Sequence, residues 1–227
     1  MAVNITTLDN GLRIASDSME GLETTSVGVW VNAGARYESP EANGISHMLE
    51  HMAFKGTHRR TAKGIAEEIE AVGGHLNAYT SREQTAYFAR VLADDLPLAV
   101  DLLGDILLNS TFDEEELARE RAVVLQEIGQ AVDTPDDQIF DFLQQVAFPK
   151  QAMGRTVLGS PERVAGFGRD DLIGYMGHHY RLPRMLVSAA GNVDHDAFVQ
   201  MAGEAFGGLG SVDESDHDPA RYGGGEF

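Results

Sequence analysis

The residues with the clearest chemical potential are two histidines four positions apart and the glutamate directly before the second: His47, Glu50 and His51. On a helix, positions i, i+3 and i+4 share a face, so these three side chains would point the same way. Two imidazoles at this spacing can hold one Zn²⁺ through ring nitrogens about 2.0–2.1 Å from the ion. The neighbouring carboxylate can take a proton from a water that the ion activates. The spacing therefore permits a hydrolytic site on about one and a half turns of helix.

The same pattern has a simpler interpretation, a histidine pair on the solvated face of a helix. A His-x-x-Glu-His sequence arises by chance in a chain of this composition and length with odds of about a few percent. Apolar residues around the motif indicate instead that the helix is half-buried: Ile45, Met48, Met52 and Phe54. A buried histidine pair needs partners for its ring nitrogens, and this requirement favours the metal.

A third ligand is required, because a catalytic zinc usually has three protein ligands and one open position. The chain contains no cysteine, so that ligand must be a histidine, an aspartate or a glutamate. Five further histidines and two acids of a predicted helix over 114–132 are candidates: His58, His75, His178, His179, His195, Glu120 and Glu127. The two glutamates are seven apart and share a helix face, so their spacing does not choose between them.

The elements that must position these residues begin with strands. Alternating apolar residues around Asn10-Gly11 predict a hairpin over 4–16. A strand follows, with Val27, Val29 and Val31 on one face. Two helices are expected next, over about 44–55 and 62–72, the first ended by Gly56 and the second capped by Thr61. Residues 75–92 alternate as two short strands around a polar turn.

Most of the remaining chain has a helical pattern. Apolar residues at helical spacing predict a helix near 96–110, and Asp113 is the expected N-cap of the long helix that follows it. Pro135 breaks that helix, and a late strand over about 184–193 precedes a final helix capped by Asp194. This order predicts an α+β fold: a mixed or antiparallel sheet of about five to six strands, covered on one face by helices. We expect one domain over 1–206 and a linker or tail over 207–227.

Composition limits the classes of partner. The formal net charge is −19, which disfavours nucleic acid and would attract a basic ligand. General acidity of soluble bacterial proteins is an equally good explanation of that charge. The first residues lack the basic and apolar regions of a signal peptide, and no stretch approaches the length of a membrane span. We therefore expect a soluble protein without a membrane partner.

Longer stretches of the chain resemble the pitrilysin family of zinc peptidases, whose motif is the inverted His-x-x-Glu-His. Within that family the likeness is greatest to the mitochondrial processing peptidases and their bacterial relatives. The matching stretches lie between about residues 5 and 206: LDNGLRIAS, VGVWVNAGARYE, GISHMLEHMAFKGT, HLNAYTSREQTAYFARV, ELARERAVVLQEI, GRTVLGSPE and MLVSAAGNV. The resemblance implies one half of a clamshell-shaped fold, in the bacterial cytoplasm or a compartment like the mitochondrial matrix.

The resemblance also implies roles for individual residues at the metal. Glu127 matches the third zinc ligand, which the spacing alone left open. Glu50 matches the general base, and Glu120 matches an acid that lies just behind the ligands.

Further residues match positions that meet the peptide in this family. Peptides there bind as an added strand along a sheet edge, and the matching residues are Asn77, Ala78, Tyr79 and Thr80. Phe54 matches the lining of the pocket just past the cleaved bond. Asp137 and Asp141 match acids that meet substrate arginines. These aspartates are four apart on one helix face, and an ordinary solvated face is the alternative for them.

The family builds a closed chamber from two homologous halves, and this sequence matches the first. We expect a zinc-dependent endopeptidase acting on peptides or presequence-like segments, with weak activity unless a second half is present. That half could be a covalent continuation, a separate chain or a second copy in a homodimer. The rival is a non-catalytic structural or partner subunit. Such members lose residues of the motif, whereas His47, Glu50, His51 and Glu127 are all present here.

Overall fold

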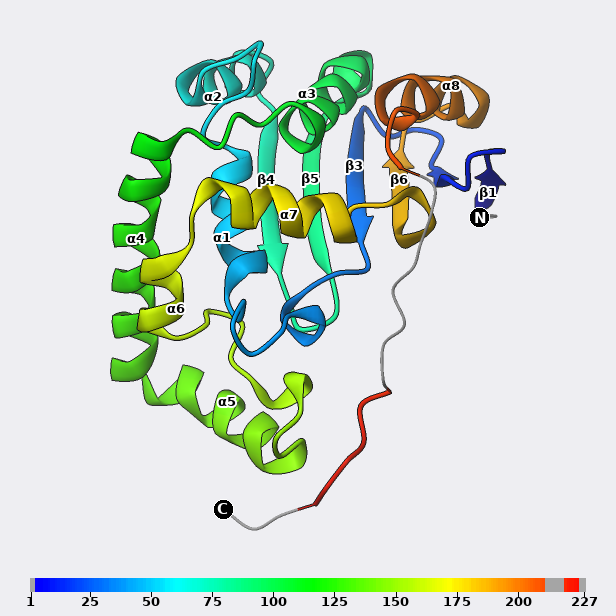
Figure 1. Cartoon of the computed structure of the whole chain (residues 1–227). Coiled ribbons are helices and arrows are strands. Elements are labelled where there is room, and N and C mark those ends of the chain that lie inside the picture. Colours follow the sequence, from blue (N-terminus) through cyan, green and yellow to red (C-terminus); the bar gives the residue numbers. More distant parts are fainter. Residues whose placement is uncertain (1–2, 211–218, 225–227) are drawn as a thin grey trace.

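The computed structural model describes residues 3–210 and 219–224. Within them, one six-stranded sheet has the order β1-β2-β6-β3-β5-β4 (Figure 1). Its strands are β1 (Asn4–Thr7), β2 (Arg13–Ser18), β3 (Thr24–Val31), β4 (His75–Thr80), β5 (Thr85–Leu92) and β6 (Met185–Gly191). β2 and β6 run parallel, and the other neighbours are antiparallel, so the sheet is mixed as predicted.

Eight α-helices lie in the described part of the chain. They are α1 (Ile45–Ala53), α2 (Ala62–Ala71), α3 (Leu96–Leu108), α4 (Glu114–Asp133), α5 (Pro135–Ala147), α6 (Pro161–Gly166), α7 (Arg169–His179) and α8 (His195–Phe206). The described residues also form four short 3₁₀ turns between these elements: η1 (Ala35–Tyr37), η2 (Ala93–Asp95), η3 (Ala152–Gly154) and η4 (Leu182–Arg184). Figure 1 shows the helices gathered on one face of the sheet, where α1, α3 and α8 pack against strands.

The predicted starts of three helices are confirmed, because a local side chain satisfies free backbone N–H groups at each of them. The Thr61 hydroxyl accepts from Gly64 N at the start of α2, and Asp113 accepts from two amides at the start of α4. Asp194 accepts from Ala197 N at the start of α8. These caps fix where each helix begins relative to the strand or loop before it.

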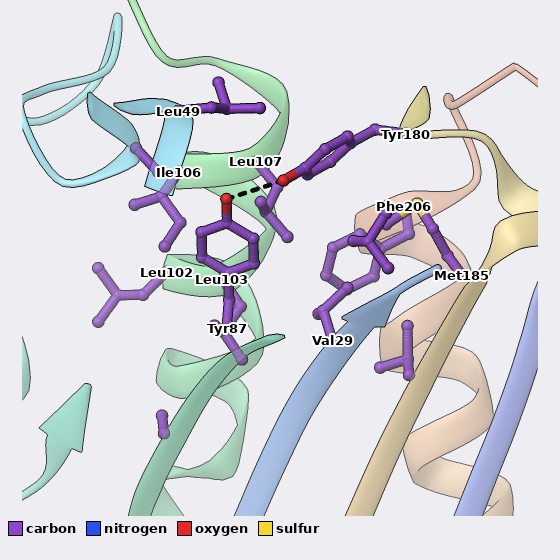
Figure 2. Packing of buried hydrophobic residues seen from close by; sticks show 14 of the residues in the cluster. Val29, Leu49, Tyr87, Leu102, Leu103, Ile106, Leu107, Tyr180, Met185 and Phe206 are labelled. Carbon is purple, nitrogen blue, oxygen red and sulfur yellow. Dashed lines mark hydrogen bonds between the residues drawn. The ribbon is translucent and has the colours of Figure 1, made fainter. Parts of the chain in front are cut away.

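The core lies between the sheet and the helices. Val27, Val29 and Val31 of β3 are buried on one face, as their alternation predicts. Figure 2 shows Tyr87 of β5 and Tyr180, which follows α7, meeting through their hydroxyls among buried leucines. The two hydroxyl oxygens are 2.9 Å apart. Burial raises the pKa of both phenols, so each remains a neutral hydrogen-bonding group. This pair ties the centre of the sheet to the helical layer.

The opposite face of the sheet has a different character. It carries a groove of about 440 Å³, and three aromatic side chains line part of it: Trp30, Tyr79 and Phe88. Tyr79 and Phe88 pack with their ring centroids 6.3 Å apart. In the described part of the chain, no helix lines this groove. An uncovered apolar face of this kind commonly marks a contact surface.

The predicted linker over 207–227 falls partly outside the described residues. The part that is described returns to the end of α5: Gly223 N donates to Ala147 O, and Tyr222 packs edge-on to Phe148. In the described residues, none of the helices is long and apolar enough to cross a bilayer.

Candidate metal centre

The metal-site candidates converge between α1 and α4. Because α1 packs directly against α4, the face that carries His47 and His51 meets Glu127. Nε2 of His47 lies 3.7 Å from Oε2 of Glu127, and Nε2 of His51 lies 3.5 Å from the same oxygen. The ligand atoms of these three residues all lie within 4.8 Å of one another. Within the described residues, this is the one cluster of three potential metal ligands.

These distances fit a shared cation better than direct hydrogen bonds. A nitrogen–oxygen separation of 3.5 Å or more is too long for a good hydrogen bond. Two ligand atoms at about 2.0–2.1 Å from one tetrahedral zinc are roughly 3.3 Å apart, which is close to the spacing here. The donor set of two imidazoles and one carboxylate is also one that catalytic zinc sites use. The residues present therefore fit a zinc ion.

The other ring nitrogen of His51 belongs to a chain of polar contacts. This atom, Nδ1, lies 3.0 Å from Oε2 of Glu120, and Oε1 of Glu120 lies 2.6 Å from Nζ of Lys55. Burial alone would raise the pKa of Glu120, but the hydrogen bonds from Lys55 and His51 outweigh it and lower that pKa. The resulting carboxylate holds the Nδ1–H tautomer of His51, which leaves Nε2 free for a metal.

Electrostatics keep the other histidine neutral. Burial, assisted by the nearby His51, lowers the pKa of His47 to about 4. A neutral imidazole is the form that binds a metal. The two rings pack edge-on with centroids 4.6 Å apart, and this contact helps to fix the direction of both.

Glu50 lies beside the ligands and is not one of them. Burial raises the pKa of its carboxyl group, and this effect outweighs the opposing influence of Thr80 and His51. Among the described residues, its Oε2 has no hydrogen-bond partner although it is buried. A buried oxygen without a partner is uncommon in a stable fold and indicates a place for a water or a substrate.

The predicted peptide-binding residues lie near this centre. β4 is an edge strand of the sheet, so residues 77–80 have one side that no other described strand pairs with. Since α1 packs on β4, that edge runs beside the helix that carries His47 and His51. Phe54 follows the last turn of α1 and lines a pocket of about 160 Å³ between α2 and β4.

The two aspartates of α5 differ in their surroundings. Asp137 is exposed, whereas Asp141 accepts a hydrogen bond of 2.6 Å from Arg82. Arg82 lies in the turn between β4 and β5, and it also donates to Met153 O. Asp141 is thus already paired with an arginine of its own chain, and a substrate arginine would have to compete with Arg82.

The other candidate histidines are not part of the cluster. His195 lies at the start of α8, where its ring nitrogens bond the hydroxyls of Thr6 and Ser16. His179 is buried and bonds Arg184. The remaining three do not join the His47, His51 and Glu127 group: His58, His75 and His178. Lys55 also contacts this site although no motif marks it, and its spacing of four from His51 is the one sequence signal for a shared partner.

Comparison with known proteins shows the family of this chain. Residues 13–161 match the family described as Insulinase (Peptidase family M16), and residues 166–226 match Peptidase M16 inactive domain. This chain belongs to peptidase family M16. The bovine mitochondrial-processing peptidase subunit beta is 47% identical over 203 residues, which are 89% of this chain and 41% of that protein. An uncharacterized zinc protease of Rickettsia bellii is 42% identical over 222 residues, 98% of this chain and 54% of that one.

Solved structures confirm the fold of this M16 chain. A protease from Helicobacter pylori superposes with a TM-score of 0.89 at 24% identity, covering 97% of this chain and 54% of the other. A Pseudomonas fluorescens peptidase M16 inactive domain gives the same TM-score at 14% identity. The predicted α+β sheet-and-helix architecture is therefore that of an M16 half. The chain spans about half the length of the relatives that it matches.

Proposed function

We propose that this chain is the zinc-binding half of an endopeptidase that hydrolyses peptides or presequence-like segments. The observation that carries the proposal is the convergence of His47, His51 and Glu127 beside an unpartnered oxygen of Glu50. Membership of M16 and the likeness to proteins named zinc proteases support it. The ligands would be His47, His51 and Glu127.

The residues around the ligands support hydrolysis. A bound zinc would supply a Lewis acid and lower the pKa of water. Oε2 of Glu50 would take the proton from the attacking water and later deliver it to the leaving amine. The raised pKa of Glu50 makes its carboxylate a stronger base, and a carboxyl whose pKa lies closer to the working pH can both take up and release a proton. Glu120 would keep His51 oriented throughout.

The peptide would bind along the edge of β4. There the backbone of residues 77–80 would pair with it as an added strand, which places its bonds beside α1. The side chain just past the cleaved bond would enter the pocket lined by Phe54. Asp137 and Asp141 would meet basic side chains, with Arg82 as the competitor for Asp141. The net charge of −19 favours basic peptides as the substrate class.

Full activity would need a second homologous half, as a covalent continuation, a partner subunit or a second copy. Relatives that match this chain are about twice as long, and the beta subunit is by its name part of a larger enzyme. The uncovered apolar groove of the sheet, with Trp30 and Phe88, supports a further element packing there. The single chain is expected to cleave peptides slowly.

The test compares the wild type with Glu50→Gln. Metal analysis after zinc loading should find one zinc in each protein, since Glu50 is not a ligand. Cleavage of a basic peptide, measured with and without the second half of the Rickettsia bellii relative, should be lost in Glu50→Gln. His51→Ala should lose the metal itself. Equal rates for wild type and Glu50→Gln would reject the assigned base.

The second candidate is a non-catalytic partner subunit of a two-chain assembly, because the bovine relative is by its name one subunit of an enzyme. It predicts that zinc binds but that no peptide is cleaved, whether or not a second half is added. Cleavage that depends on both the second half and Glu50 would exclude it.

A further inference from the structure

The helix that carries two of the three proposed ligands, α1, lacks a cap of its own. α1 begins at Ile45, and the residue before it, Gly44, has a left-handed φ of 100° and no side chain to cap the helix. A Cβ at Gly44 would lie 2.8 Å from the carbonyl oxygen of Leu158, so no capping side chain fits there. The first turn also contains no acidic residue. The free N–H groups of this helix end must therefore be satisfied from elsewhere.

Glu38, six residues before Gly44, satisfies two of them, those of Gly44 and Ser46, while Ile45 N donates to Ala42 O. Oε2 of Glu38 accepts from Gly44 N at 2.8 Å and from Asn43 Nδ2 at 2.9 Å. Its Oε1 accepts from Ser46 N at 2.8 Å and from the Ser46 hydroxyl at 2.6 Å. Glu38 is only 5% exposed. A buried carboxylate with four donors at a helix N-terminus also compensates the positive end of the helix dipole.

Neighbouring elements hold this carboxylate in place. Asn43 Nδ2 also donates to Thr156 O, and Arg155 donates to the backbone oxygen of Glu38. The hydroxyl of Tyr175, on α7, lies 2.8 Å from that of Ser46. Since the Ser46 hydroxyl donates to Glu38, the Tyr175 hydroxyl is the donor to Ser46. The end of α1 is thus tied through Glu38 to the 155–156 segment and through Ser46 to α7.

The consequence concerns His47, which is the third residue of α1. Helix ends fray, so a ligand in the first turn is fixed only if that turn is closed. A metal centre needs its ligands held to within about 0.5 Å. We propose that Glu38 is a positioning residue of the metal centre, which closes the first turn of α1 and so fixes His47. The proposal rests on the proposed function, since it takes His47 as a zinc ligand.

The experiment measures metal binding by Glu38→Ala and Glu38→Gln in the 227-residue chain. Zinc affinity is measured by competition with a chromophoric chelator, and ligand geometry by the absorption spectrum of bound Co²⁺. Loss of a residue that orients a ligand typically costs 10–100-fold in metal affinity, and we expect about tenfold for Glu38→Ala. Its cobalt bands should shift or weaken. Glu38→Gln keeps one acceptor oxygen for Ser46, so its loss should be smaller.

The matched control is Asp194→Ala, which removes a carboxylate cap from α8, a helix without any proposed ligand. It should lower the melting temperature and leave zinc affinity and the cobalt spectrum unchanged. If Glu38→Ala is less heat-stable but binds zinc within twofold of the wild type with the same cobalt spectrum, Glu38 is only a structural cap and the inference is overturned. If Glu38→Ala does not fold, the same comparison is decided by Glu38→Gln. A wild type that binds neither metal overturns the proposed function as well.

Discussion

Glu120→Gln tests the metal centre through a residue that would not touch the metal. In the structure the Glu120 carboxylate bridges Nδ1 of His51, at 3.0 Å, and Nζ of Lys55, at 2.6 Å. Glutamine has the same size but one acceptor oxygen, so it can serve either His51 or Lys55. Its NH₂ group then faces the other donor. In the wild type, the negative charge of Glu120 favours the Nδ1–H tautomer of His51 and raises the basicity of His51 as a ligand. The substitution removes both effects.

We expect Glu120→Gln to weaken zinc binding by about 10–100-fold, the usual effect of losing a carboxylate behind a ligating histidine. This corresponds to about 1.4–2.7 kcal/mol of binding free energy at 25 °C. Competition with a chromophoric chelator at neutral pH measures it directly. Glu115→Gln is the matched control, since it makes the same change on α4 with a side chain that is 85% exposed. Zinc affinity within twofold of the wild type for Glu120→Gln would refute the orienting role.

Three further predictions concern stability. Burial alone would raise the pKa of Asp105, but hydrogen bonds from Arg60 and other donors outweigh burial and lower that pKa. The ionised Asp105 side chain therefore stabilises the folded protein at pH values above the unfolded-state pKa near 3.9, and this stabilisation is lost as pH falls through the lower folded-state pKa. Asp105→Asn should therefore be less stable to urea than the wild type at pH 7, with the difference shrinking toward pH 3; a difference independent of pH would contradict this. Tyr87→Phe removes the 2.9 Å hydrogen bond to the buried Tyr180 hydroxyl and should cost about 1–3 kcal/mol, whereas the double change to phenylalanine should cost less than the two single changes added together. Leu103 is fully buried, so Leu103→Ala should leave a cavity and lower the free energy of unfolding by about 2–5 kcal/mol without changing zinc affinity. A loss below about 1 kcal/mol would show that the core relaxes to fill the cavity.

The local parts of this protein could be predicted from the sequence. His47, Glu50 and His51 share a face because the helical repeat alone sets their direction. The N-caps Thr61, Asp113 and Asp194 were predictable for a related reason. Each bonds an amide two or three residues away, so the contact does not depend on the rest of the fold.

The tertiary structure decided which distant groups meet. Glu120 and Glu127 lie on the same face of α4, and only the packing of α4 on α1 places Glu127 at the two Nε2 atoms and Glu120 behind His51. The insertion of β6 between β2 and β3, and the pairing of Arg82 with Asp141, likewise join residues far apart in the chain. Glu38 is the clearest example of a contact that the sequence alone does not predict. Its carboxylate caps a helix that starts seven residues later, because a loop folds back over Gly44 and excludes any side chain there. A local pattern does not encode such contacts, since they depend on how separate elements pack.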